Sequence, residues 1–281
     1  MKRSWTVLWR RCFMFEIPMI RVDQKEYLER LQEGEFFMRS SLYYQTLDHK
    51  DAARSDPYDG TIPSDNPTGL PFSELGIAGI TNSRIMIGHT FIKCFFYYNK
   101  TDCHQLQNGV YLLTMKADAR NALSNFSSSY ALIILKPSEF VEQVSRACHK
   151  EEVNLWYSEV EYLTSEELDQ RSVEFLTGQS KTHPVFYKNE FFRSQQEFRF
   201  CVQVPYKHIS EPKILNGIEY QMINLEAKDE TYTLHIGSLK SISCILPMSE
   251  MLNYPVVVDT SKREVSFLSE VDYEKIEGQR D

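Results

Sequence analysis

Apolar and polar residues alternate most regularly between residues 197 and 204 of this 281-residue chain. The apolar positions of this stretch are Phe198, Phe200, Val202 and Val204. Because successive side chains of a β-strand point to opposite faces, the pattern predicts a strand whose apolar face packs on the core. The other face carries Glu197 and Arg199. Either this face is part of a binding site, or the two charged side chains form an ion pair with each other.

Similar alternation and short apolar runs predict the other strands. They lie at residues 35–44, 84–98, 110–116, 130–135, 154–163, 232–236, 242–246, 256–258 and 265–267. Helices are predicted after Asp23 and Thr164, each of which has a glutamate three residues later, as in a capping box. A third helix is expected to follow Pro137, and Gly34 is expected to end the first one.

These elements predict one α+β domain at residues 14–269, since strands outnumber helices and no linker or repeat separates them. Its sheet is expected to be twisted and mostly antiparallel, either continuous or split, with helices at its edges. Residues 1–13 are interpreted as a dispensable extension and residues 270–281 as a charged, frayed tail. Proline and glycine breakers predict a long loop at 48–76, a length typical of functional lids or disordered segments.

Composition narrows the range of partners. The net charge of −8 argues against a broad nucleic-acid-binding surface, although it leaves a local basic groove open. No stretch approaches the roughly 20 apolar residues of a membrane span, so we expect a cytoplasmic protein without membrane contact. The six cysteines include no Cys-x-x-Cys pair, which favours reduced thiols and predicts no zinc site.

Several enzyme motifs are missing. The chain has no G-x-S-x-G nucleophile elbow, no G-x-G-x-x-G loop and no Walker loop. Four aspartates of the 48–76 loop do not match EF-hand spacing, so no metal site is predicted. His89 sits inside an apolar strand pattern, which favours a buried core histidine over a catalytic base, and we keep it as a candidate ligand-binding residue.

The remaining candidates are Arg39 on an early strand and Glu197 on a late one. In the plainer interpretation they are structural, and Glu197 pairs with Arg199 or Arg39. In the functional interpretation they share a concave face, where Arg39 binds a phosphate or carboxylate through its two-pronged guanidinium. Glu197 would then stabilise a developing positive charge or act as a base, and Tyr43 or Tyr44 would stack on a planar ring.

Several segments resemble a family of small uncharacterised bacterial and prophage proteins, and more distantly the DUF2971 proteins. The segments are residues 36–44, 56–60, 130–134, 138–140, 188–199 and 235–242. The late strand of the DUF2971 proteins carries a Lys…Glu-x-Arg pattern, which corresponds here to Lys188, Glu197 and Arg199. The resemblance implies relatives but no activity.

A second resemblance is to ADP-ribosyltransferases with an Arg…Ser-Thr-Ser…Gln-x-Glu order. Arg39, residues 127–129 and the pair Gln195 and Glu197 follow that order, although no threonine stands in the middle segment. The resemblance implies an ADP-ribosyltransferase-like fold and NAD as the co-substrate. It also implies that Arg39 holds the NAD diphosphate, that Glu197 stabilises the ribosyl cation, and that Gln195 orients the acceptor.

We therefore expect an NAD-dependent ADP-ribosyltransferase that modifies a macromolecule, as a toxin or phage-defence effector. The predicted ligand-binding set is Tyr43, Tyr44, Gln195, Arg199, His89 and Lys188. The alternative is a non-catalytic prophage or defence module that recognises a nucleotide or a partner protein through the aromatic face and the 48–76 loop. A third hypothesis, a nuclease holding Mg²⁺ on Asp56, Asp59 and Glu197, is opposed by the acidic surface.

Overall fold

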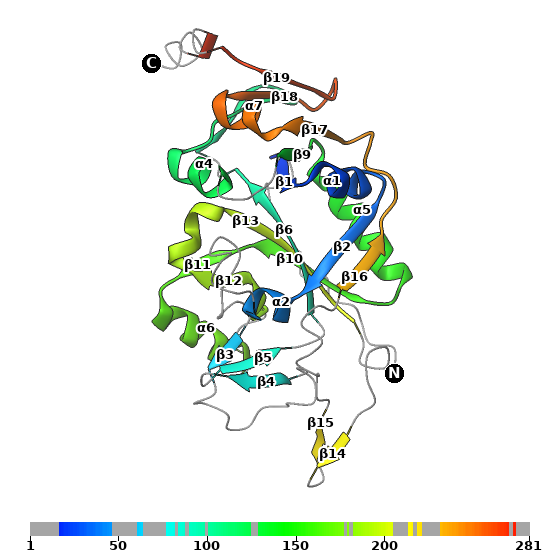
Figure 1. Cartoon of the computed structure of the whole chain (residues 1–281), viewed down its shortest axis with the longest axis vertical. Coiled ribbons are helices and arrows are strands. Elements are labelled where there is room, and N and C mark those ends of the chain that lie inside the picture. Colours follow the sequence, from blue (N-terminus) through cyan, green and yellow to red (C-terminus); the bar gives the residue numbers. More distant parts are fainter. Residues whose placement is uncertain are drawn as a thin grey trace.

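The computed structural model describes most of the chain (Figure 1). It covers residues 17–46, 61–63, 77–81, 84–87, 90–98, 101–124, 129–176, 179, 182–204, 213–215, 218–220, 231–269 and 272–273. The predicted extension at 1–13, nearly all of the 48–76 loop and most of the 270–281 tail lie outside these residues. His89, Asp56, Asp59, Ser127 and Ser128 also lie outside them.

An eight-stranded antiparallel sheet forms the centre of the fold, as predicted for an α+β domain. Its strands are β1 (Met19–Asp23), β2 (Glu35–Ser40), β6 (Thr90–Tyr97), β9 (Tyr130–Ile134), β10 (Asn154–Glu159), β13 (Glu197–Gln203), β16 (Thr231–His235) and β17 (Ser243–Pro247). The main path runs β10-β13-β6-β1-β9-β17, and β2 joins β6 to β16. The predicted strand at 197–204 is thus internal to the sheet.

The sheet forks along one edge of β6. β13 pairs with the whole opposite edge, whereas β1 pairs only with the end of β6 at Phe96 and Tyr97. β2 pairs only with the beginning, at Phe91 and Ile92. From there β1 continues to β9 and β17, while β2 continues to β16. Residues 93–95 therefore face a gap between β1 and β2, with neither strand as a ladder partner.

Aromatic side chains pack between one face of the sheet and helix α5 (Pro137–Lys150). The ring of Phe200 meets that of Phe36 edge-on at 5.5 Å and that of Phe140 at 5.3 Å. Phe198 and Val202 belong to the same cluster, which confirms the apolar face predicted for this strand. The other face of β13 is buried as well, because Cys201 packs against Val185.

Two predictions near the start of the chain differ from the structure, namely the end of one strand and the first residue of one helix. The strand predicted at 35–44 stops at Ser40, and residues 41–46 form α2 (Ser41–Thr46). Helix α1 (Lys25–Gln32) has Gln24 at its N-cap with no side-chain cap bond. Asp23 does not cap α1 because it ends β1, where its carboxylate accepts a hydrogen bond from Arg21. Gly34 follows α1 with φ of +105°, as a helix-ending glycine should.

Of three further predictions, one is confirmed and two predicted strands are each divided in the structure. The run at 154–163 breaks at Val160. The N–H of Val160 still donates to the carbonyl of Glu197, but β11 (Glu161–Leu163), which follows it, lies outside the central sheet. The capping box at Thr164 and Glu167 is confirmed by reciprocal hydrogen bonds at the start of α6 (Ser165–Leu176). The predicted run at 84–98 forms two strands, β5 (Arg84–Ile87) and β6.

Smaller elements surround the central sheet. A second sheet has the order β19-β18-β8-β7, and it comprises β7 (Cys103–Gln107), β8 (Val110–Leu113), β18 (Val256–Asp259) and β19 (Glu264–Phe267). The rest are β3 (Thr61–Pro63), β4 (Ile77–Thr81), β12 (Tyr187–Asn189), β14 (Lys213–Leu215), β15 (Ile218–Tyr220), α4 (Ala117–Ser124), α7 (Met248–Asn253), η3 (Pro184–Phe186) and η4 (Glu190–Gln195). None of the described helices has both the length and the apolar character needed to span a membrane.

Candidate functional site

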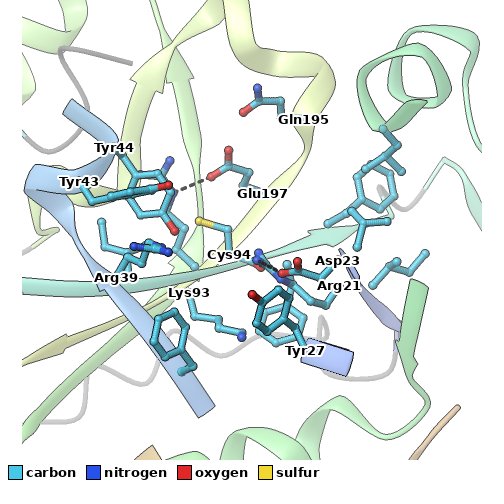
Figure 2. A pocket seen from close by; sticks show the side chains of 18 of the residues that line it. Arg21, Asp23, Tyr27, Arg39, Tyr43, Tyr44, Lys93, Cys94, Gln195 and Glu197 are labelled. Atoms are coloured by element: carbon cyan, nitrogen blue, oxygen red, sulfur yellow. Dashed lines mark hydrogen bonds and ion pairs between the residues drawn. The ribbon is translucent and has the colours of Figure 1, made fainter. Parts of the chain in front are cut away.

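A cavity of about 320 Å³ lies at the fork of the sheet (Figure 2). β1, α1, β2 and α2 border it, and residues 92–96 of β6 line it. Seven of the eight predicted site residues line this one cavity, namely Arg39, Tyr43, Tyr44, Lys188, Gln195, Glu197 and Arg199. Residues 39 and 197, far apart in the sequence, thus share one hollow, as the functional interpretation of the sequence requires. The eighth, His89, lies outside the described residues.

Glu197 is the centre of a buried ion cluster. Lys188 Nζ donates to Glu197 Oε1 at 2.8 Å, and Arg199 Nε donates to Glu197 Oε2 at 2.7 Å. Lys188 also donates to Gln195 Oε1 at 2.7 Å, and Arg199 Nη1 donates to the carbonyl of Val185 at 2.6 Å. The side chains of Lys188 and Arg199 are 3% and 2% exposed, whereas that of Glu197 is 12% exposed. Glu197 is therefore the most exposed side chain of the three.

Burial alone would raise the pKa of the Glu197 carboxyl, but Arg199 and Lys188 together hold that pKa far below its ordinary value. The carboxylate is ionised at any physiological pH, which suits electrostatic stabilisation better than proton abstraction. The ion pair with Arg199 that the sequence suggested is present, and Lys188 is the second cation of the cluster.

Arg39 enters the cavity from β2. Its guanidinium lies over the ring of Tyr43 at 4.1 Å and near that of Phe37 at 5.6 Å. No carboxylate of the described residues forms an ion pair with Arg39. A guanidinium stacked in this way keeps its N–H edges for another partner, and a phosphate or carboxylate matches the geometry of those edges.

Arg21 is a cavity residue that sequence reasoning missed. It lies on β1, and its Nη1 donates to the carbonyl of Cys94 at 2.9 Å, where β6 has neither β1 nor β2 as a ladder partner. Its Nη2 donates to Asp23 Oδ2 at 2.8 Å, and its buried Nε finds no hydrogen-bond partner among the described residues. The signal was the alternation of Arg21 and Asp23 with apolar residues, but the run is short and was not predicted to be a strand.

Lys93 is a second missed residue. It lies within β6 and is 8% exposed, with its Nζ 5.7 Å from the ring centre of Phe36. Burial, and after it the nearby positive charge of Arg21, lower the pKa of Lys93 to about 7, although Asp23 offsets part of the shift. A lysine inside a predicted strand with aromatic neighbours could have been noticed, since such a residue must either pair or reach an opening.

Cations outnumber carboxylates around the cavity. The cationic lining residues are Arg21, Arg30, Arg39, Lys93, Lys188 and Arg199, against the three carboxylates of Asp23, Glu35 and Glu197. Arg30 pairs with Glu35 at 2.6 Å and Arg21 pairs with Asp23, so the excess rests on Arg39, Lys93 and the Glu197 cluster. In a chain of net charge −8, this is a local excess of basic side chains.

Two further observations bear on the chemistry. Ser129, the described part of the 127–129 segment, is not among the residues that line the cavity. Its carbonyl accepts a hydrogen bond from Met248 N at 2.9 Å, next to β9. Within the described ranges, no group of three or more His, Cys, Asp or Glu side chains is arranged to hold a metal ion.

Comparison with known proteins adds no relative to this description. No family model, no curated protein and no solved structure matches the chain.

Proposed function

We propose that this cavity binds NAD and that the protein transfers ADP-ribose from NAD to a macromolecule. The observation that supports it best is the pairing of an excess of positive charge with a permanently ionised carboxylate, Glu197, in one cavity beside aromatic rings. The phosphates of NAD would bind to the positively charged side chains, and its planar rings would stack on the aromatic side chains. The volume of about 320 Å³ lies within the range of small-ligand sites.

Each side of the cavity has a part in this proposal. Arg39, stacked on Tyr43, binds the diphosphate, and Arg21, which is paired with Asp23, lines the cavity from β1. Tyr43 and Tyr44, whose rings meet edge-on at 5.4 Å, form the aromatic wall for nicotinamide. The early-strand arginine of the resembling transferases therefore has two candidates, Arg39 on β2 and Arg21 on β1.

Glu197 acts on the bond that breaks. As the bond between the ribose carbon and the nicotinamide nitrogen lengthens, positive charge develops on the ribose, and a fixed carboxylate stabilises it. The electron pair leaves with nicotinamide, and the acceptor then forms its bond to the same carbon. Lys188 and Arg199 hold the carboxylate oxygens in place, and Gln195, bound to Lys188, lies where it can orient the acceptor.

The test needs a variant that lacks the carboxylate of Glu197 but keeps the net charge of the buried cluster. Glu197→Gln leaves Lys188 and Arg199 as two uncompensated buried cations, which should cost about 3–5 kcal/mol of stability. The double variant Glu197→Gln/Lys188→Met restores the net charge of +1 that the wild-type cluster carries. We expect this double variant to recover stability but to release nicotinamide from NAD at least about a hundredfold more slowly than wild type.

Lys188→Met alone is the matched control, because it retains the carboxylate and its bond to Arg199. We expect it to keep measurable NAD turnover. Nicotinamide release by the double variant at the rate of Lys188→Met would refute the role of Glu197. A toxin or phage-defence effector would slow bacterial growth when expressed, and the double variant would not.

A non-catalytic nucleotide-binding module is the second candidate. The observation that favours it is that both oxygens of Glu197 already accept hydrogen bonds from cations, which reduces the field available to a cationic transition state. Under this alternative, NAD raises the thermal unfolding temperature without any release of nicotinamide.

A further inference from the structure

Lys93 and Glu197 reach the same cavity from opposite faces of β6. Lys93 lies on the same face of β6 as Phe91 and Phe95, whose rings belong to the main core. Glu197 pairs with Phe96, which lies on the other face. Figure 2 shows Glu197 and Gln195 on one side of β6 and Lys93 and Tyr27 on the other. The gap between β1 and β2 connects the two sides, so the cavity has a second end whose chemistry differs from that of Glu197.

The amine of Lys93 has no acceptor among the described residues of this second end. No ion pair or hydrogen bond joins it to any of them, and its Nζ lies over the ring of Phe36. The charged groups that line the cavity around it are Arg21 and Asp23 on β1, Arg30 on α1, and Glu35 and Arg39 on β2. Asp23 and Glu35 are already bound to Arg21 and Arg30, respectively.

A lysine in such surroundings is a nucleophile. With the pKa of Lys93 near 7, about half of its molecules carry a free amine at neutral pH. An exposed lysine with an ordinary pKa of about 10.4 has less than a thousandth of its amine free under the same conditions. Desolvation of this kind is a recognised way of activating a lysine toward carbonyl compounds.

We propose that Lys93 is a second reactive site of this protein, an amine that forms an imine with a phosphorylated aldehyde bound in the cavity. Its lone pair attacks the carbonyl carbon, a carbon–nitrogen double bond forms, and the carbonyl oxygen leaves as water, with no change of oxidation state. Asp23 lies close enough to favour the protonated imine electrostatically, and the phosphate finds the excess positive charge of Arg39 and its neighbours. This step uses neither NAD nor Glu197, so it stands apart from the proposed transferase activity.

Pyridoxal 5′-phosphate is a suitable probe, because it joins an aldehyde and a phosphate on a planar ring. The full-length protein is incubated with one equivalent at pH 7, reduced with borohydride to fix the imine, and mapped by mass spectrometry of its peptides. We expect Lys93 to be labelled at least about tenfold more than Lys25, Lys116 or Lys262, which are half-exposed or more. Labelling of Lys93 should be half-maximal near pH 7.

Three comparisons complete the test. Lys93→Arg should remove the main label, whereas Lys25→Arg, on the neighbouring helix, should leave it unchanged. Pyridoxal, which lacks the phosphate, should label Lys93 at least about tenfold more weakly. Label spread evenly over the exposed lysines of the wild-type protein overturns the proposal, and this result needs no variant to fold. Equal labelling by the two aldehydes overturns the requirement for a phosphate.

Discussion

The two buried lysines of the cavity differ in whether a carboxylate binds their amine. Lys188 is 4% exposed and donates to both Glu197 and Gln195, so its positive charge is compensated where it lies. Lys93 is 8% exposed and lies over an aromatic ring, with no carboxylate of the described residues bound to it. A buried charge without a partner favours its neutral form. The same type of side chain is therefore bound to a carboxylate in one place, whereas in the other it has a lowered pKa.

This difference predicts how stability depends on pH. The pKa of Lys93 falls from 10.5 in the unfolded chain to about 7 in the folded protein, so the unfolded state binds more protons between these values. The free energy of unfolding should therefore rise as the pH increases from 7 to 10, by at most about 4 kcal/mol. Urea unfolding across this range should show the rise in wild type.

Lys93→Met should remove most of that rise, because methionine has a similar length and no charge. The exposed Lys25→Met is the control and should retain it. Identical pH profiles for wild type and Lys93→Met would show that the amine is solvated and ordinary.

At the scale of elements, the corner between α1 and β2 depends on one glycine. Gly34 has φ of +105°, and a Cβ atom on it would lie 2.5 Å from the carbonyl oxygen of Gly237. The corner is joined to the segment after β16, since Ile236 N donates to the carbonyl of Gly34 at 3.0 Å and Leu239 N to that of Gln32 at 2.8 Å. The backbones can approach this closely only because Gly34 has no side chain.

Alanine at these two glycines should therefore have unequal effects. Gly237 has φ of +86°, but a Cβ atom on it would have no described atom within 4 Å, so Gly237→Ala should cost about 1 kcal/mol from backbone strain alone. Gly34→Ala adds a clash with backbone and should cost at least about 2 kcal/mol more. Urea denaturation of both variants measures the difference, and equal costs would mean that the corner can open without penalty.

The sequence predicts elements better than it predicts the site. Alternation locates β13 and its core face, and the capping box locates α6, because both signals are local. β1 is missed since five residues with two charges among them are too short a pattern. Arg39 and Glu197 are placed in one cavity, but Arg21 and Lys93 are not found. Their positions depend on the fork in the sheet, and pairing between distant strands leaves no local mark in the sequence.

At the scale of the whole molecule, charge is distributed unevenly. The chain has a net charge of −8, yet the cavity lining has six basic and three acidic side chains. A surrounding negative charge repels anions, whereas the local excess of cations attracts them at short range. Anion binding should consequently depend on contacts within the cavity and weaken when salt screens them.

Thermal unfolding with ADP-ribose tests this distribution. At a concentration about a hundred times the dissociation constant, a ligand of the folded state adds about 2.7 kcal/mol of stability, which corresponds to an increase of several degrees in the unfolding temperature. We expect such an increase at low salt, a smaller one at about 0.5 M NaCl, and little with Arg39→Met. An increase that survives both changes would place the binding site elsewhere.

The fork in the sheet is closed on every side. β1 leaves β6, α1 returns the chain to β2, β2 rejoins the same edge of β6, and the segment after β16 fastens the far corner. The sheet is thus pierced by an aperture with a continuous rim. An occupant of this aperture touches the carboxylate of Glu197 on one side and the amine of Lys93 on the other. The proposed NAD site and the proposed imine site therefore share one aperture, and a ligand bound at either site should exclude the ligand of the other.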